Sequence, residues 1–92
     1  MEVSNLQTSK TSIDQTEIQA WIVNYIAELL EVESELVNPT ISFDRYGLDS
    51  SAAYALTGDL EEWLGQEIDP TAIYDYPTVE ALSEHLNSMV AN

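Results

Sequence analysis

The sequence predicts an all-α protein, a small antiparallel four-helix bundle with three longer helices, one short helix and a long first loop. Three observations support this fold class. Apolar residues recur at three- and four-residue steps in three separate segments, which is the spacing of a buried helix face. No segment alternates apolar and polar residues as a half-buried strand does. The 92 residues suffice for one domain and are too few for two.

The charge of the chain is strongly unbalanced. The chain has 17 Asp and Glu residues and only two basic residues, Lys10 and Arg45, which gives a formal net charge of -15. Nucleic-acid binding needs clustered Lys and Arg, so this composition disfavours nucleic acid and, by the same repulsion, an anionic membrane surface. The charge favours encounters with basic protein surfaces, although it would also serve simply to keep a small domain in solution.

Two absences narrow the function classes further. The chain has no cysteine, which excludes a disulfide framework, a thiolate metal site and a Cys nucleophile. The first residues lack the basic and apolar runs of a secretion signal, and no stretch approaches the ~18 apolar residues of a membrane span. We therefore expect a cytoplasmic location. We also expect the protein to be a monomer.

Residues 1–13 are expected to form a mobile tail or linker, because this segment is polar, rich in Ser and Thr, and has no sustained period. The domain is expected over residues 14–92. Asp14 and Glu17 make a capping-box-like start for a first helix. One face of that helix collects seven apolar residues: Ile18, Trp21, Ile22, Tyr25, Ile26, Leu29 and Leu30.

The helical period fails from Glu33 to Asp49, and Asn38-Pro39 disfavours helix. We expect this long loop to be ordered, because apolar anchors along it could pin it across the open end of the bundle. These anchors are Leu36, Val37, Ile41, Phe43 and Leu48.

A second helix is predicted from about Ser50 to Leu64, with Gly65 as a left-handed stop. Gly58 inside it costs roughly 1 kcal/mol relative to Ala, which indicates either a close packing contact or nothing. The predicted inner stripe of this helix is Ala53, Leu56, Leu60, Trp63 and Leu64.

Two more helices complete the prediction. Asp69-Pro70-Thr71 reads as an N-cap followed by Pro at the first helical position, starting a short helix through Tyr74 that Pro77 ends. Thr78 can cap a last helix. Its apolar residues again recur at three- and four-residue steps: Val79, Leu82, Leu86, Met89 and Val90.

The segment Gly47-Leu48-Asp49-Ser50 ends the long loop and opens an acidic helix. That string alone fits many loop-to-helix junctions at which Asp or Ser simply caps. It is followed, however, by Asp59-Leu60-Glu61-Glu62-Trp63-Leu64-Gly65 and then by Tyr74-Asp75-Tyr76-Pro77-Thr78-Val79-Glu80-Ala81-Leu82. Together, at this spacing, the three segments resemble acyl carrier proteins in the form typical of polyketide synthase carriers. The resemblance covers about Thr16 to Val90.

This resemblance implies that Ser50, the Ser directly after Asp, carries a covalent 4'-phosphopantetheine arm. The arm would hold acyl or polyketide intermediates as thioesters and shuttle them between synthase enzymes. The implied partners are a phosphopantetheinyl transferase, acting with magnesium and coenzyme A, and then ketosynthase, acyltransferase and tailoring enzymes with basic docking surfaces. A Ser at the first turn of a helix suits this role, because unpaired N–H groups and the positive end of the helix dipole favour a phosphodiester.

The acidic residues around Ser50 admit several interpretations. Asp49 is an N-cap, a magnesium ligand during transfer, or a partner contact. Asp59, Glu61 and Glu62 are either a solvated helix face or, as the resemblance implies, a docking surface for basic partners.

Ser51 departs from the family, in which Leu or Met commonly follows the modified Ser. Partner contacts are therefore assigned to Ser51 and to other positions such as Tyr54, and Ser51 is a second hydroxyl that could be mistaken for the attachment point. We assign attachment to Ser50 from its place after Asp49.

Other functions stay open from the residues alone. A fatty-acid or peptidyl carrier is the near alternative, and a cofactor-free acidic helical adaptor is another. Hydrolysis by Ser50 needs an adjacent base, and the only His, His85, is expected as a surface or boundary imidazole on the last helix. No enzyme activity is therefore expected. No metal site is expected either, because Asp44 to Asp49 lacks the alternation and closing Glu of a calcium loop.

Overall fold

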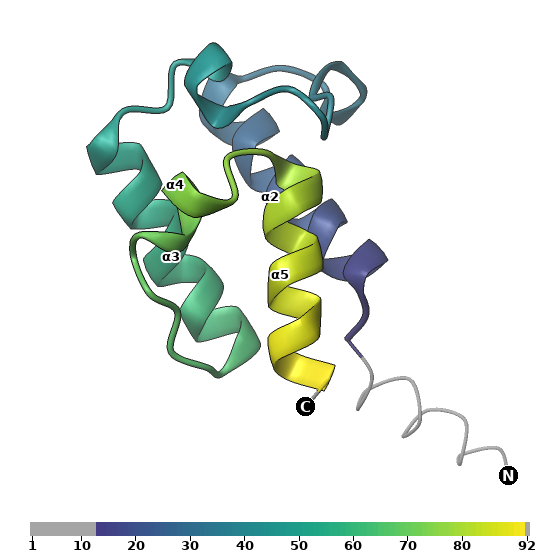
Figure 1. The fold of residues 1–92 in the computed structure, drawn as a ribbon. Helices are drawn as coiled ribbons and strands as arrows, with labels where there is room; N and C mark the ends of the chain where they lie inside the picture. The colour runs from purple at the N-terminus through teal and green to yellow at the C-terminus, as the bar shows by residue number, and fades with distance from the viewer. Residues whose placement is uncertain (1–12, 92) are drawn as a thin grey trace, which may run out of the picture.

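The computed structural model describes residues 13–91, and these form a helical bundle without a β-strand (Figure 1). The α-helices are α2 (Gln15–Leu30), α3 (Ser50–Leu64), α4 (Ala72–Asp75) and α5 (Val79–Ala91). The loop after α2 contains two 3-10 turns, η1 (Ser34–Leu36) and η2 (Phe43–Tyr46). Three longer helices, one short helix and a long first loop are as predicted. None of the helices in this part of the chain is long and apolar enough to cross a membrane.

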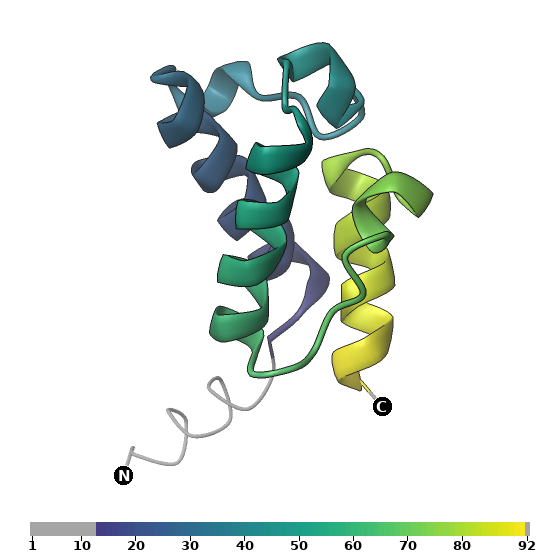
Figure 2. The same ribbon diagram turned by 90° about the vertical axis from the view of Figure 1, so that its left-hand side faces the viewer.

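The helix directions place the end of α2 and the start of α3 at the same end of the bundle. α2 runs antiparallel to α3 and α5, whereas α3 and α5 run in the same direction (Figures 1 and 2). The chain between α3 and α4 makes this arrangement possible, because it returns along the bundle after α3 ends (Figure 2). The first residue of α3 therefore lies beside the long loop.

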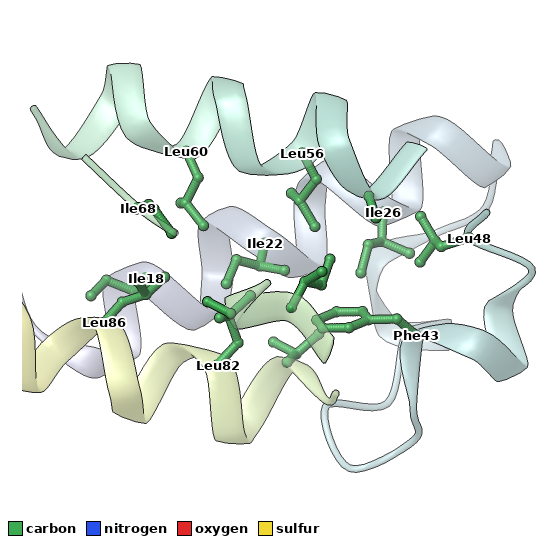
Figure 3. Close-up of a cluster of buried hydrophobic side chains, with 14 of the residues drawn as sticks. Ile18, Ile22, Ile26, Phe43, Leu48, Leu56, Leu60, Ile68, Leu82 and Leu86 are labelled. Carbon is green, nitrogen blue, oxygen red and sulfur yellow. The ribbon is translucent and has the colours of Figure 1, made fainter. Parts of the chain in front are cut away.

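A single apolar core fills the space between the helices (Figure 3). α2, α3 and α5 contribute Ile, Leu and Val side chains, and the loop contributes Phe43 and Leu48. Full burial of one such side chain stabilises the fold by about 1.5–3 kcal/mol. The side chains with almost no exposed area are Ile18, Ile22, Ile26, Leu56, Leu60, Val79, Ser83 and Leu86.

The start of α2 is capped as its sequence predicts. The Asp14 carboxylate accepts a hydrogen bond from the Glu17 N–H at 3.0 Å. Ile13, which we assigned to the tail, is half-buried and packs against the core. It precedes the N-cap, and Ile18 occupies the fourth helical position, so the two residues hold the positions of a hydrophobic staple. The rest of the predicted tail lies outside the described residues.

The end of α2 is closed by Glu31 in the left-handed region, at φ 60. The Val32 N–H donates to the Ala27 carbonyl at 2.9 Å, and the Glu31 N–H donates to the Glu28 carbonyl at 3.2 Å. This is the pair of bonds of a Schellman motif, which usually places Gly at the position of Glu31.

Four predicted core positions are wrong. Leu29 and Leu30 are exposed by 48% and 37%, although their spacing continues the buried pattern of α2, and Leu36, predicted as an anchor of the loop, is exposed by 67%. Leu29 and Leu30 belong to the last turn of α2, and periodicity gives the face of a helix but not the point at which its neighbours stop covering it. Trp63 lies at the edge of the core, where it is 36% exposed and its ring stacks on that of Trp21 with centroids 5.4 Å apart.

The long loop is ordered, as predicted, and it is bonded to the corner between α4 and α5. The Phe43 N–H donates to the Pro77 carbonyl at 2.8 Å, and the Glu80 N–H donates to the Pro39 carbonyl at 3.0 Å. Phe43 is itself buried in the core. The loop therefore closes one end of the bundle at fixed points.

The short helix begins later than predicted. Asp69 is not its N-cap, because the Asp69 carboxylate accepts hydrogen bonds from the N–H and the hydroxyl of Thr71, at 2.9 and 2.8 Å, which folds Asp69 to Thr71 into a turn. α4 starts only at Ala72. The cap of α5 is confirmed, since the Ala81 N–H donates to the Thr78 hydroxyl oxygen at 3.0 Å.

Candidate functional site

The last residues of the long loop determine where Ser50 lies at the start of α3. Gly47 follows the last residue of η2, and its φ of 75 lies in the left-handed region that favours glycine. Leu48 is then buried in the core, and Asp49 is extended. Ser50 follows as the first helical residue, with its side chain exposed.

Asp49 caps α3. Its carboxylate Oδ1 accepts a hydrogen bond from the Ala52 N–H at 2.9 Å, and its carbonyl accepts from the Ala53 N–H at 2.9 Å. Of the three interpretations of Asp49, the N-cap is therefore realised. The N–H groups of Ser50 and Ser51 have no acceptor among residues 13–91. These free donors, with the positive end of the helix dipole, favour an anion attached at this point.

A side-chain clamp that no pattern in the sequence indicated stabilises the loop before Ser50. The Tyr46 hydroxyl oxygen accepts a hydrogen bond from the Asn38 N–H at 2.6 Å and donates to the Asn38 carbonyl at 3.3 Å. The Asn38 side chain in turn accepts from the N–H and hydroxyl of Thr40, at 2.9 and 2.8 Å. Tyr46 thus joins η2 to a turn eight residues earlier, a contact that no spacing rule predicts.

The Ser50 hydroxyl makes no hydrogen bond to any residue from 13 to 91, and no base within that range contacts it. His85 is half-buried on α5, where its ring stacks on Tyr76 with centroids 4.2 Å apart and an interplanar angle of 11°. It is a boundary imidazole, as predicted. A nucleophilic serine needs a base within hydrogen-bond reach, and none of the described residues forms a hydrogen bond with the Ser50 hydroxyl.

In the acidic run Asp59, Glu61 and Glu62, the first two carboxylates accept hydrogen bonds inside the molecule, as that of Asp49 does. The Asp59 carboxylate accepts a hydrogen bond from the Tyr25 hydroxyl at 2.9 Å, which links α3 to α2. Burial and this acidic neighbour raise the pKa of Tyr25 above its ordinary value. The Glu61 carboxylate accepts from the Ile68 N–H at 2.8 Å and so fastens the chain after α3 to the helix.

The remaining predicted contacts are open to solvent. Glu62 and Ser51 are exposed, and Tyr54, one turn after Ser50, is 71% exposed. The structure therefore brings Ser50 and Tyr54 onto one face of α3, because residues four apart share a helix face.

Comparisons with known proteins agree with this geometry. A family described as "Phosphopantetheine attachment site" matches residues 20–86, which is most of the chain. TtuC, an acyl carrier protein of Teredinibacter turnerae, is 32% identical over 84 residues, which cover 91% of this chain and 97% of TtuC. The polyketide synthase PksL of Bacillus subtilis is 29% identical over 68 residues, which cover 74% of this chain but only 2% of that synthase.

Solved structures give the same result. A free-standing peptidyl carrier protein from Acinetobacter baumannii superposes with a TM-score of 0.79 at 40% identity, covering 84% of this chain and 96% of that one. An acyl carrier protein from Anabaena sp. PCC 7120 with a variant phosphopantetheinylation-site sequence gives a TM-score of 0.80 at 36% identity, covering 86% and 93% of the two chains. The chain therefore belongs to the acyl carrier protein family, whose domain carries the attachment site of phosphopantetheine.

Proposed function

We propose that Ser50 is the residue that carries the 4'-phosphopantetheine arm. The observation that supports this most strongly is the placement of its hydroxyl, exposed at the first position of α3 and without a hydrogen bond among the described residues. The donor set fits the group, because a phosphodiester on this oxygen would lie beside the free N–H groups of Ser50 and Ser51. When attached, the arm supplies a thiol that holds an acyl chain as a thioester.

The residues before Ser50 would hold the attachment oxygen at one place. Asp49 fixes the first turn of α3, and Leu48 anchors the preceding chain in the core. Ser51 is exposed as well, but it is one residue further along the helix and lacks the preceding Asp. The protein then acts as a carrier that is modified and loaded by other enzymes and catalyses no reaction itself.

We further propose that this carrier serves polyketide assembly. The supporting observations are the polyketide synthases among its relatives and the net charge of -15, which favours weak docking to basic enzyme surfaces. A phosphopantetheinyl transferase, a ketosynthase, an acyltransferase and tailoring enzymes are the corresponding partners. A domain over residues 14–92, a monomeric state and a cytoplasmic location stay predictions from the sequence.

A second candidate is a peptidyl carrier. The supporting observation is the structure of the Acinetobacter baumannii peptidyl carrier protein, which matches 84% of this chain at 40% identity. Loading of the finished arm separates the two candidates. A polyketide carrier would accept acyl groups from an acyltransferase, whereas a peptidyl carrier would accept an aminoacyl group from an adenylation enzyme.

The attachment site is tested by incubating the protein with coenzyme A and a promiscuous phosphopantetheinyl transferase, followed by intact-protein mass spectrometry. The wild type and Ser51→Ala should each gain one arm, and Ser50→Ala should gain none. Circular dichroism checks that both variants fold. Modification of Ser50→Ala together with loss of modification in Ser51→Ala would overturn the assignment, and no modification of the wild type would leave a cofactor-free adaptor as the better interpretation.

A further inference from the structure

Among residues 13–91, the Tyr46 hydroxyl is the only side-chain group of η2 that makes hydrogen bonds to the rest of the long loop. It accepts the Asn38 N–H at 2.6 Å and donates to the Asn38 carbonyl at 3.3 Å. The Tyr46 ring is half-buried and packs against the core, so the ring itself holds the hydroxyl in place. We call these two hydrogen bonds the Tyr46 clamp.

On its far side, the Tyr46 clamp is fixed to the bundle. The Asn38 side chain accepts hydrogen bonds from the N–H and the hydroxyl of Thr40, which folds residues 38–40 into a turn. In the middle of this turn, the Pro39 carbonyl accepts the Glu80 N–H at 3.0 Å. Glu80 belongs to the first turn of α5. The clamp therefore connects the end of η2 to α5 through three consecutive residues.

On its near side, the Tyr46 clamp leads to the attachment serine. Tyr46 is the last residue of η2, and Ser50 follows four residues later. The first residue of a helix frays easily, and the Ser50 N–H has no acceptor among residues 13–91. The position of Ser50 therefore depends on the chain that precedes it.

That preceding chain contains one residue that bends easily. Leu48 is anchored in the core and Asp49 caps α3 (Figure 3). Gly47, however, has the largest conformational freedom of any residue type and joins Leu48 to η2. If η2 were released from the Tyr46 clamp, it could tilt about Gly47 and pull on the residues that present Ser50.

Loss of the Tyr46 clamp would loosen this segment without unfolding the bundle. Phe43, at the other end of η2, stays buried and keeps the bond from its N–H to the Pro77 carbonyl at 2.8 Å. Asn38 is exposed, so water can replace the Tyr46 hydroxyl at its peptide groups. The clamp thus affects the order of the loop near Ser50 more than the stability of the fold.

We propose that the Tyr46 hydroxyl is a positioning group for the modification of Ser50. It makes no hydrogen bond to Ser50 and acts through residues 47–49, which it holds in the arrangement that the transferase recognises. A carrier without the clamp is in this arrangement for only part of the time, and the apparent affinity of the transferase falls by that fraction. The inference rests on the proposed function of Ser50.

The test is the variant Tyr46→Phe in the pantetheinylation assay. Phe keeps the ring that packs against the core and removes only the oxygen of the clamp. The net contribution of such hydrogen bonds corresponds to a roughly three- to tenfold rise in the KM of the transferase for the carrier. The value of kcat should be unchanged, because a saturated transferase holds only the competent arrangement. The melting temperature should fall by no more than roughly 8 °C.

The matched control for stability is Asp14→Ala, which removes one side-chain hydrogen bond of 3.0 Å at the N-cap of α2. The start of α2 lies at the end of the bundle opposite the start of α3 (Figure 2). Because loss of a cap destabilises a helix at least as much as loss of the clamp, the melting temperature should fall by a similar amount or more. The KM should nevertheless stay at the wild-type value.

Amide hydrogen exchange gives a readout that needs no enzyme. The Asn38 N–H is bonded to the Tyr46 hydroxyl oxygen, so in Tyr46→Phe it should exchange roughly tenfold faster than in the wild type. The Phe43 N–H is bonded to the Pro77 carbonyl, an anchor that the variant keeps, and should exchange at the wild-type rate. Together these rates show whether the loop opens locally or as a whole.

Each other outcome contradicts a different statement. If the wild type accepts no arm, the proposed function of Ser50 fails. If the wild type is modified and Tyr46→Phe has an unchanged KM, the positioning role alone is wrong. If Asp14→Ala raises KM as much as Tyr46→Phe does, the defect comes from lost stability and the positioning role is also wrong. If the Asn38 and Phe43 amides accelerate together, the hydroxyl holds the whole loop and not the segment at Ser50, which overturns the inference as well.

Discussion

Glu61 offers a direct way to separate a structural carboxylate from a docking carboxylate. Its Oε2 accepts the N–H of Ile68, and the Ile68 side chain is only 3% exposed. In Glu61→Ala this N–H loses its acceptor in a part-buried position, which costs about 1–3 kcal/mol. Taking about 2 kcal/mol, and a change of roughly 4–8 °C per kcal/mol for a domain of this size, the melting temperature should fall by roughly 8–16 °C.

The matched control is Glu62→Ala, which removes the same charge from the next residue. Glu62 is exposed and accepts no hydrogen bond from residues 13–91, so its replacement should change stability by no more than about 0.5 kcal/mol. Glu61→Gln, whose amide oxygen can still accept the Ile68 N–H, should lie between the two. Thermal unfolding followed by circular dichroism measures all three. Equal melting temperatures for Glu61→Ala and Glu62→Ala would refute the structural role of Glu61.

Two further predictions concern α2. Tyr25 should titrate above the ordinary tyrosine pKa of 10.0, mainly because of burial and then because of Asp59, and Asp59→Asn should bring its pKa back toward that value in an ultraviolet titration. Because the pKa of Tyr25 is raised in the folded state, the contribution of this hydroxyl to the free energy of unfolding is complete below pH 10 and is lost as the pH rises through the folded-state pKa. A Tyr25 that titrates at or below 10.0 would contradict the contact with Asp59. Glu31→Gly should stabilise the protein by about 0.5–1 kcal/mol in a denaturant titration, because Glu31 has φ 60. Glu33→Gly, which removes the same charge at an extended position, should give no gain, and an equal gain in both would mean that charge rather than backbone strain is responsible.

The sequence was sufficient wherever a local rule determines the structure. The bounds of α3 follow from Asp49 as N-cap and Gly65 as left-handed stop, and the cap of α5 follows from Thr78. The predicted attachment residue Ser50 stands at the first helical position for the same reason.

Local rules fail where the structure depends on contacts between distant segments. The exposure of Leu29 and Leu36 depends on where neighbouring elements end, which periodicity does not contain. The bond from Tyr25 to Asp59 spans 34 residues, so neither could be distinguished in the sequence from an ordinary boundary tyrosine and a solvated carboxylate. The sequence could not indicate the surface groove lined by Tyr54, Gly58, Ile68 and Pro70 either, because this groove forms only where the chain after α3 folds back beside that helix.

Two backbone hydrogen bonds join the long loop to the chain at the start of α5, and they limit how such a carrier moves: the Phe43 N–H donates to the Pro77 carbonyl, and the Glu80 N–H donates to the Pro39 carbonyl. The Phe43 and Glu80 amides can open only if the loop separates from the start of α5, and this also uncovers the Phe43 ring. The loop that leads to Ser50 can therefore separate from the bundle only together with part of the core. The freedom to visit one active site after another belongs to the arm and to the tumbling of the whole domain.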